Sequence, residues 1–557
     1  MNAFILLLIW ALPVLLAVLA GQRYARWLMV LAPLPALVAG AALPVGASVS
    51  LPWLLLGIEL GLDDTGRVFL LFSGLLWLVA SLYAAGTPLN ERNAARYRVF
   101  FLLAMAGNLG LIVAQDMASF YFGFTLMGLA AYGLIAQPAS QRARRAARRY
   151  LIWTIAGELI LFVAIVLLAA QNGGALAFGV LASNPPAGLI VPLLIVGFGI
   201  KLALPGLHFW LPQAYAVTPP AAVAVLSGAM IKAGLLGWLR FLPPGDAVLA
   251  GWGQVMIGIG VTGIFFGALF ALLQQRPRLV LGYSSISKMG VLTTGMGAAL
   301  AWPTAAPVLI GALVIYAAHH ALVKAALFLG LGLAERGGLR PWLLVGLGFL
   351  ALALAGAPLT SGALAKSALS AALPQPAHDL LSVLAASAFA TTLVMARFLL
   401  LSLHQRTGVT SPHATVSVIA WLALLAVIAV FPFAFADAGD LMTGAVPLSA
   451  GALLAALALL MGARLPARIV LGNRRVAGRR LVSHFHKGVR GLTGAASQAS
   501  LILSSALRSM GEPVRLSMKR RLIGLKMSSD SEYRWPLAGS VWLAIAGLLL
   551  NAFVLSP

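Results

Sequence analysis

The sequence contains no cysteine and very few acidic residues. Without cysteine, the chain forms no disulfides, zinc–thiolate sites or cysteine-ligated iron–sulfur clusters. Any redox chemistry linked to it must therefore take place in a partner. Only 14 residues are Asp or Glu, against 38 Lys and Arg, and the charged fraction is 9%, whereas about a quarter of a soluble domain is charged. No G-x-x-x-x-G-K-[ST] loop occurs, so direct use of ATP is not expected.

Hydrophobic residues instead make up 61% of the chain. They come in blocks of about twenty, the length that a helix needs to cross the hydrocarbon core of a bilayer. This pattern predicts an all-α polytopic membrane protein with about sixteen transmembrane helices, because a β-barrel would give short alternating segments. The block from Asn2 to Ala20 lacks a basic start and a clear cleavage site, so we expect a first span and not a removed signal.

The net charge of +24 first suggests a nucleic-acid partner. Its distribution argues otherwise. Residues 464–526 hold fourteen Lys and Arg against one acid, Glu512, and five arginines cluster between Arg142 and Arg149. Both groups flank apolar spans, as cytoplasmic loops do under the positive-inside rule. We therefore expect no nucleic-acid partner, and we expect residues 464–526 to meet anionic lipid headgroups.

Loop charges alternate in step with the predicted spans. Basic turns such as the one at Arg278 fall on one side, and the acidic residues Asp63, Asp64, Asp437 and Asp440 fall on the other. The positive-inside rule places the basic loops in the cytoplasm and both termini on the opposite side. The sequence thus predicts a multi-pass protein of a bacterial-type cytoplasmic (inner) membrane.

The spans fall into groups separated by polar segments. The polar, basic stretch before the last span is predicted to form a lateral interfacial helix, with a disordered basic linker as the alternative. The predicted segments are 1–98 with spans 1–3, 99–241 and 251–403 with five spans each, 414–463 with spans 14 and 15, 464–536 as the basic interfacial segment, and 537–555 as the C-terminal span.

Two of the predicted spans contain helix-breaking residues. Residues 201–220 include Pro205 and Pro212, and residues 354–366 include Pro358. Proline interrupts the helical ladder, and inside a membrane irregular backbone occurs only where protein or a water-filled cavity covers it. Paired broken helices are typical of inverted-repeat transporters, although proline kinks also arise for packing alone.

Charged and titratable residues occur deep inside these apolar spans. Each costs at least roughly 2.5–3.5 kcal/mol near the bilayer centre, so a chain with many of them is expected to move ions or protons. Eleven residues form this set: Asp116, Glu158, Lys201, His208, Lys232, Lys288, His319, His320, Lys324, Lys366 and Arg397.

Lysine, glutamate and histidine can pass protons along such a series. Burial favours the neutral form of lysine, a nearby carboxylate favours the charged form, and pairings that switch therefore relay protons. Lys201 and Lys232 lie on consecutive spans around the first break. His320 and Lys324 are four residues apart and share a helix face, whereas His319 points about 100° away. The adjacent histidines therefore do not predict a metal site, and the sequence predicts no bound cofactor.

The remaining candidates have competing interpretations. Glu158 is the only glutamate within a span and is predicted to be functional. Asp116 opens the fifth span and either caps that helix or acts functionally. Arg397 lies near a helix end, where snorkelling to the membrane surface is the simpler explanation. His208, in the first break, is a possible accessory group.

Several stretches together resemble the antiporter-like membrane subunits of complex I, membrane-bound hydrogenases and Mrp-type cation/proton antiporters. The resemblance covers residues 99–370. The stretches that carry it are DMASFYFGFTLMGLAAY, KLALPGLHFWLPQAY, LSGAMIKAGLLGWLRF, LVLGYSSISKMG, HHALVKAALFLGLG and GAPLTSGALAKSAL.

The resemblance implies two inverted five-helix units, each with a broken helix and a lysine. It implies that Lys201 and Lys366 are the broken-helix lysines and that Lys232 is the connecting lysine. His320 and Lys324 are then groups of the central axis. It also implies assembly with other membrane subunits of a hetero-oligomeric complex.

Two positions depart from the family pattern. The fifth span usually carries a glutamate that pairs with the first broken-helix lysine, and here that place is Thr125, which cannot hold a charge. Glu158 on the next span is the candidate replacement. Lys288 follows the SSIS run where the family commonly has histidine, which either alters the relay or indicates a structural or gating role.

The sequence leaves four functions open. The first is a proton-translocating subunit of a hydrogenase-like or complex I-like energy-converting complex. The others are an Mrp-type Na+/H+ antiporter subunit, the membrane subunit of an inorganic-carbon (CO2/bicarbonate) uptake complex, and a structural scaffold with an inactive channel.

Overall fold

The computed structural model describes residues 2–22, 24–54, 56–87, 91–244, 249–403 and 414–434. The described residues form one unit. The predicted fifteenth span, the basic segment 464–536, its lipid contacts and the final span 537–555 lie outside the described residues.

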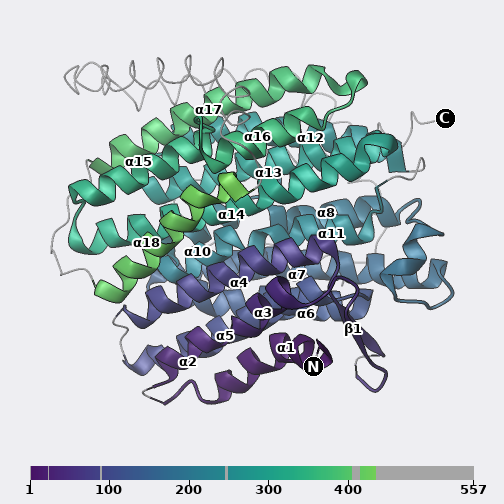
Figure 1. Ribbon diagram of the computed structural model, residues 1–557, viewed down its shortest axis with the longest axis horizontal. Coiled ribbons are helices and arrows are strands. Elements are labelled where there is room, and N and C mark those ends of the chain that lie inside the picture. The colour runs from purple at the N-terminus through teal and green to yellow at the C-terminus, as the bar shows by residue number, and fades with distance from the viewer. Residues whose placement is uncertain are drawn as a thin grey trace, which may run out of the picture. The chain divides into compact units, whose positions relative to one another are not determined.

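Helices dominate the described chain (Figure 1). The first half contains α1 (Asn2–Val18), α2 (Ala25–Leu31), α3 (Leu34–Ala42), α4 (Asp64–Ala85), α5 (Glu91–Val113), α6 (Met117–Ala136), α7 (Gln141–Gln171), α8 (Ile190–Leu202), α9 (Leu211–Val217), α10 (Pro220–Gly228) and α11 (Ala233–Phe241). The second half contains α12 (Ala250–Leu272), α13 (Pro277–Ala301), α14 (Ala306–Gly337), α15 (Pro341–Ala355), α16 (Ser361–Ala371), α17 (Asp379–Leu403) and α18 (Thr415–Val430). Short 3-10 turns are η1 (Phe178–Ala182), η2 (Met230–Lys232), η4 (Pro303–Ala305), η5 (Gln375–Ala377) and η6 (Phe431–Ala434).

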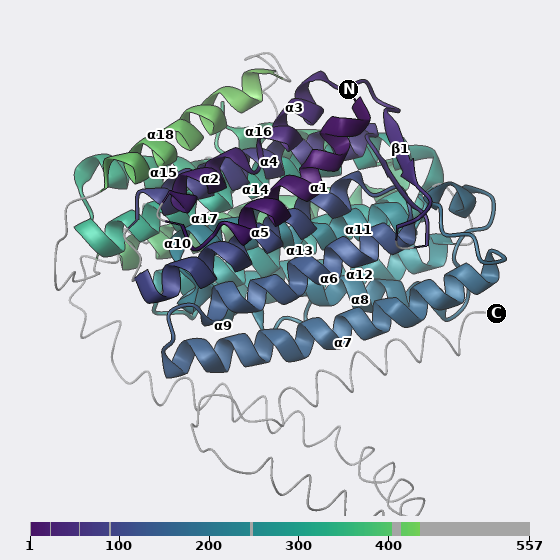
Figure 2. The same cartoon turned by 90° about the horizontal axis from the view of Figure 1, so that it is seen from below.

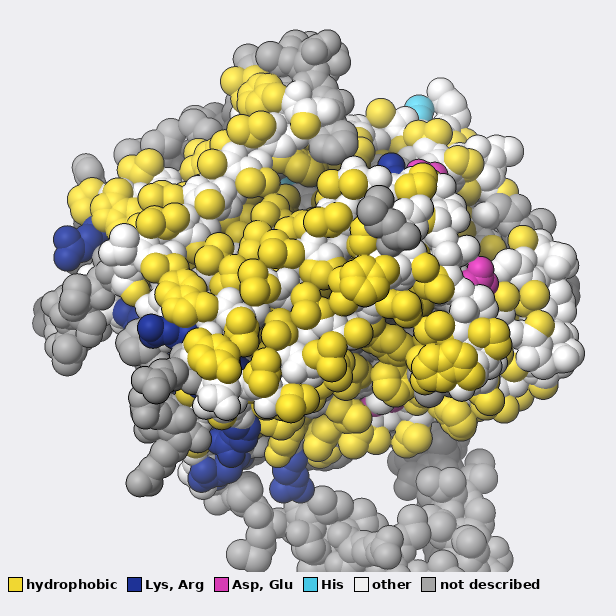
Figure 3. Space-filling model, turned by 60° about the horizontal axis from the view of Figure 1, so that its bottom comes forward, with side chains coloured by type: hydrophobic (Ala, Val, Ile, Leu, Met, Phe, Trp, Pro, Cys, Tyr) yellow, Lys and Arg dark blue, Asp and Glu magenta, His cyan; other side chains and the backbone are white. Residues whose placement is uncertain are grey.

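Ten of the helical spans in the described part are long and apolar enough to cross a membrane. The apolar helices α1, α8 and α15 are shorter. The prediction of a polytopic helical membrane protein agrees with this, whereas the count of sixteen spans and the inverted-repeat symmetry stay predictions. Hydrophobic side chains cover most of the face in Figure 3, and most of its Lys and Arg side chains gather at one edge. On α7, for example, Leu159, Phe162 and Val163 are exposed, as expected for a surface in contact with lipid or another subunit.

Helix α14 lies at the centre and contacts α10, α13 and α16 (Figure 1). Almost every side chain from Ala312 to Ala334 is buried. A helix that is apolar and buried on all sides is a core helix, so its histidines and lysine cannot reach lipid. Helix α7 lies along an outer side, packed against α6 and α8 (Figure 2).

A small β-hairpin is the element that the all-α prediction missed. Strands β1 (Ser48–Leu51) and β2 (Ile58–Gly61) pair antiparallel, with Ser48 opposite Gly61. Four-residue strands are too short to show a convincing period-2 pattern in sequence. The backbone N–H of Gln115 donates to the Glu59 carbonyl at 2.9 Å, which attaches the hairpin to the chain that enters α6.

The first predicted break separates α8 from α9. Ala203, just after α8, adopts a left-handed conformation with φ 55°. Two bonds close the helix end there, from Leu204 N–H to the Gly199 carbonyl and from Ala203 N–H to the Ile200 carbonyl, each 3.1 Å. This is a Schellman motif, usually built on glycine. The indole N–H of Trp210 also donates to the Ile200 carbonyl at 2.8 Å, so the Gly199 and Ile200 carbonyls at the broken end are hydrogen-bonded.

The second break, between α15 and α16, has the same motif. Gly356 has φ 89°, Ala357 N–H donates to the Leu352 carbonyl at 3.0 Å, and Gly356 N–H donates to the Ala353 carbonyl at 3.1 Å. The helix is broken where the sequence predicts it. The last turns of α8 and α15 therefore both present helix C-termini, whose partial negative charge favours a cation, inside the protein.

A third interruption was not predicted. The sequence indicates one span over 220–241, but α10 ends at Gly228 and a 3-10 turn, η2, precedes α11. Single turns of 3-10 helix within a helix often mark functional positions. Lys232 is the last residue of this turn.

Gly362 fixes the approach of α16 to α15, and its replacement tests this packing. A Cβ at Gly362 would lie 1.8 Å from the Ala353 carbonyl oxygen. Because the clashing atom is backbone, we expect Gly362→Ala to destabilise the protein by about 1–3 kcal/mol or more, measured as a lower Tm of the purified complex. Gly348→Ala is the matched control, since nothing lies within 4 Å of the added methyl group. Equal Tm values for the two variants would contradict the packing argument.

Candidate functional site

Lys201 lies in the last turn of α8, at the first break, with a buried side chain. Its Nζ donates to the Tyr150 hydroxyl of α7 at 3.3 Å and lies 5.3 Å from the centre of the Phe124 ring of α6. The Tyr150 hydroxyl donates in turn to the Gly128 carbonyl of α6 at 3.0 Å. One amine and one phenol thus join three helices in the described structure.

Glu158 approaches the same part of α6 from α7. It is 5% exposed, and its Oε1 is buried without a hydrogen-bond partner among the described residues. Its carboxylate fits there because Gly128 has no side chain: a Cβ at Gly128 would lie 2.4 Å from Oε1. Glu158 interacts electrostatically with Lys201, although the two form no direct ion pair in the described part of the chain.

Thr125, the position of the missing fifth-span glutamate, lies on α6 three residues before Gly128. Tyr121 connects this region to Glu158, because its side chain interacts with Thr125 and its hydroxyl donates to the Glu158 carbonyl at 3.2 Å. The α6 face that carries Thr125 is therefore close to the part of α7 that carries Glu158.

Lys232 lies at the third helix interruption, in the turn η2 between α10 and α11, and is fully buried. Its Nζ donates to the Ser227 carbonyl at 2.7 Å. The 3-10 turn explains why this carbonyl accepts a side-chain donor, since a break in the ladder leaves backbone groups without their usual helical partners. Close packing joins the region to the first break: Gly234 lies against Leu202 and the Phe198 carbonyl of α8, where a Cβ would come within 2.7 and 2.8 Å.

His320 and Lys324 lie on the same face of α14, as predicted. The Lys324 Nζ donates to the Leu281 carbonyl at 2.8 Å and to the Ser284 hydroxyl at 3.0 Å, both on α13. Both ring nitrogens of His320 are buried without a hydrogen-bond partner among the described residues. An unpaired buried imidazole is costly, which indicates a group kept for function or bound to water.

His319 and Lys288 interact with other helices. His319 Nδ1 and the hydroxyl of Ser361, the first residue of α16, share a hydrogen bond of 2.9 Å. The Lys288 Nζ donates to the Thr391 hydroxyl of α17 at 2.5 Å. Of the adjacent histidines, only His319 has a side-chain hydrogen bond among the described residues. These residues contain no group of three or more His, Cys, Asp or Glu that could hold a metal ion.

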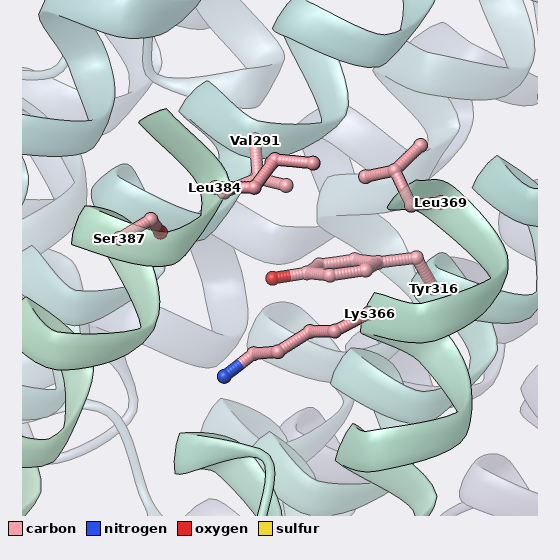
Figure 4. A pocket seen from close by; sticks show the side chains of 6 residues that line it. All are labelled: Val291, Tyr316, Lys366, Leu369, Leu384 and Ser387. Carbon is pink, nitrogen blue, oxygen red and sulfur yellow. The ribbon is translucent and has the colours of Figure 1, made fainter. Parts of the chain in front are cut away.

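Lys366 lies just past the second break. Its Nζ donates to the carbonyl of Ala355, the last residue of α15. A small cavity beside it has room for roughly one water molecule. In Figure 4 the Lys366 and Tyr316 side chains lie next to each other, with amine and hydroxyl on the same side. The cavity is lined by Val291, Tyr316, Lys366, Leu369, Leu384 and Ser387.

Charge–charge interactions connect the central and distal groups into one series. Lys232 interacts with Lys324, Lys324 with Lys288, and Lys288 with Lys366. His320 interacts with the first three of these lysines. The structure thus places these predicted residues together, with Glu158 and Lys201 as a separate pair at the first break.

Three other candidates lie elsewhere. Asp116 caps α6, because Oδ1 accepts from Ser119 N–H and Oδ2 from Glu59 N–H, each at 2.8 Å. This geometry favours the capping alternative. His208 packs against aromatic rings, with Phe266 at 4.8 Å. The Arg397 guanidinium donates to the Gln274 carbonyl at 3.2 and 3.3 Å, which supports a structural role.

Two polar residues of the site were missed in the sequence. Tyr150 and Tyr316 are buried next to Lys201 and Lys366. Tyr150 could have been found from spacing, since Tyr150, Thr154 and Glu158 recur every four residues on one face of α7. Nothing in the local sequence distinguishes Tyr316 from an ordinary core tyrosine.

Comparisons with known proteins place this site in a family. Residues 114–394 match the family described as NADH:quinone oxidoreductase/Mrp antiporter, TM, and the chain belongs to this family. It is thus an antiporter-like, polytopic membrane protein of a family found in bacterial membranes.

Individual relatives agree with this assignment. The chain is 33% identical over 292 residues to NADH-quinone oxidoreductase subunit N of Desulforudis audaxviator, covering 50% of this chain and 56% of that protein. It is 29% identical over 290 residues to hydrogenase-4 component B of Escherichia coli, covering 49% and 43%. The chain spans about half the length of the curated relatives it matches.

A solved structure shares the fold. A chain of the Mrp complex from Dietzia sp. DQ12-45-1b superposes with a TM-score of 0.65 at 22% identity, covering 80% of this chain and 96% of that chain. The antiporter-like fold predicted from the sequence is thereby confirmed. These relatives and neighbours are components of multi-subunit membrane complexes.

Proposed function

We propose that this chain is the proton-translocating subunit of a multi-subunit energy-converting complex of the hydrogenase or complex I type. Protons would move along a relay of buried side chains near the membrane midplane. The relay comprises Glu158, Lys201, Lys232, Lys324, His320, Lys288, His319 and Lys366.

One observation carries the proposal: within the described residues, a lysine lies at each of three helix interruptions, with a buried side chain at Lys201 and Lys232 and a half-buried one at Lys366. Lys201 is at the end of α8, Lys232 is in η2, and Lys366 contacts the end of α15. At two of these interruptions the lysine donates to a backbone carbonyl, Lys232 to Ser227 and Lys366 to Ala355, and broken helices in membranes surround ion pathways. Because neighbouring cations repel one another, a proton that arrives on one lysine promotes release from the next.

The arrangement of segments and partners belongs to the same proposal. Residues 99–241 would form the first repeat around Lys201, and residues 251–403 the second around Lys366. The basic loops would face the cytoplasm. Mass spectrometry of the gently solubilised complex tests the assembly: redox subunits support the proposal, whereas small hydrophobic partners alone indicate an Mrp-type antiporter and one large zinc-binding protein indicates inorganic-carbon uptake.

Glu158→Gln tests the relay at its first step. The substitution keeps the size of the side chain and removes the charge that acts on Lys201. We expect proton uptake by inverted membrane vesicles that contain the full complex to fall by about a hundredfold or more, the contribution typical of one proton-transfer group. Adding Thr125→Glu to this variant should restore part of the uptake, because the face of α6 that carries Thr125 is close to the part of α7 that carries Glu158.

The matched control is Asp379→Asn, which neutralises a carboxylate in the first turn of α17, outside the proposed relay. It should leave uptake unchanged. Wild-type uptake in Glu158→Gln would show that Glu158 does not replace the fifth-span glutamate.

A further inference from the structure

Tyr150 contacts Lys201 and also Gly128, the residue against which the Glu158 carboxylate packs. It receives a hydrogen bond from Lys201 at 3.3 Å and donates one to the Gly128 carbonyl at 3.0 Å. Glu158 Oε1 lies over the Cα of the same glycine. The phenol therefore contacts the amine on one side and the residue that shapes the carboxylate site on the other.

The carboxylate and the amine do not meet directly among the described residues. Glu158 and Lys201 are in no direct ion-pair contact in the described residues, yet they interact electrostatically. Within the part of the chain that the structure describes, the Glu158 Oε1 has no hydrogen-bond partner, so it can accept one. The charge of Glu158 also acts on Tyr150.

We propose that the Tyr150 hydroxyl carries protons between Lys201 and Glu158. This rests on the proposed proton-translocating function. When the Lys201 ammonium gives a proton to the phenol oxygen, the phenol O–H turns from the Gly128 carbonyl and gives its own proton to the Glu158 carboxylate. Lys201 becomes a neutral amine, Glu158 becomes a neutral acid, and Tyr150 is unchanged. The reverse step returns the charges.

The surroundings of Tyr150 suit a fixed ring with a mobile proton. The ring packs edge-on against Trp210, with centroids 5.2 Å apart, and the residue is buried. The titratable groups that face the hydroxyl in the described structure are Lys201 from α8, Glu158 from α7 and Tyr215 from α9. Packing thus holds the ring while its O–H can exchange acceptors.

Tyr150→Phe keeps the ring and removes the hydroxyl. In inverted vesicles of the full complex we expect uptake to fall by at least about tenfold, with the complex still assembled. Tyr83→Phe is the matched control, because Tyr83 is also buried and donates to a backbone carbonyl, Leu329 O at 3.2 Å, but contacts no relay group among the described hydrogen bonds. Its uptake should stay within about twofold of the wild type.

A second variant separates proton transfer from packing. Replacing Tyr150 by 3-fluorotyrosine leaves the shape nearly unchanged and makes the phenol more acidic, so the pH profile of uptake should shift to lower pH. The proposed role of Tyr150 is refuted if 3-fluorotyrosine leaves the pH profile of uptake unchanged. It is also refuted if uptake in Tyr150→Phe equals uptake in Tyr83→Phe. Wild-type uptake in both Glu158→Gln and Lys201→Met would instead refute the proposed function itself.

Discussion

Replacing Gly128 by alanine is expected to reduce proton uptake to the level of Glu158→Gln while the protein stays folded. The added Cβ would lie 2.4 Å from Glu158 Oε1 and 3.0 Å from Thr154 Cγ2. The carboxylate is the free end of a flexible side chain, so it turns away and the helices keep their positions. The fall should again be about a hundredfold, because the proton-transfer group has left its site.

Gly258→Ala is the control for this variant. Gly258 lies within α12 and nothing is within 4 Å of an added Cβ, so the substitution should leave uptake intact and slightly favour the helix. Gly128→Ala is assayed as the assembled complex in inverted vesicles. If Gly128→Ala retains wild-type uptake, the carboxylate does not need the space that the missing side chain of Gly128 provides, and the proposed position of Glu158 is wrong.

Much of the fold follows from local signals in the sequence. The apolar blocks predict the helices, because an isolated apolar stretch of this length has few other stable states in a bilayer. Pro205 and Pro358 lie in the two breaks between half-helices, where the ladder is interrupted. The cap of α6 is local as well. Asp116 directly precedes the helix, and its carboxylate accepts a hydrogen bond from the hydroxyl of Ser119, three residues later.

The interruption at Lys232 could not be predicted in the same way. No proline or positive-φ glycine lies in η2. Gly228 and Gly234 flank it, but glycine also occurs inside the unbroken helix α13, for example at Gly290, so it does not mark a break by itself. The turn leaves the Ser227 carbonyl to accept from the Lys232 amine five residues later, a pairing that sequence spacing alone does not reveal.

The groups that the buried side chains contact could also not be predicted from the sequence. Spacing predicts that His320 and Lys324 share a face, but it cannot show that Lys324 bonds to Leu281 and Ser284. Those contacts depend on how α13 packs against α14. The same holds for Glu158 and Gly128, which are on different helices and meet only because a glycine leaves room for a carboxylate.

Lys324→Met is expected to abolish proton translocation without lowering stability. Lys324 is fully buried, and methionine removes the desolvation cost of a cation at this site, which offsets the hydrogen bonds lost to Leu281 and Ser284. The substitution removes a proton carrier between Lys232 and Lys288, with both of which Lys324 interacts. Uptake by vesicles of the full complex should fall by about a hundredfold or more, and the Tm should not decrease.

Arg397→Met provides the matched cation-to-methionine control. Arg397 is partly buried and donates to the Gln274 carbonyl, but it lies outside the proposed relay. Its loss should lower the Tm, because Gln274 loses a donor that links α17 to the end of α12, and should leave uptake near the wild-type value. The opposite pattern, with uptake retained in Lys324→Met and lost in Arg397→Met, would mean that the buried lysine of α14 serves packing and that protons take a different route.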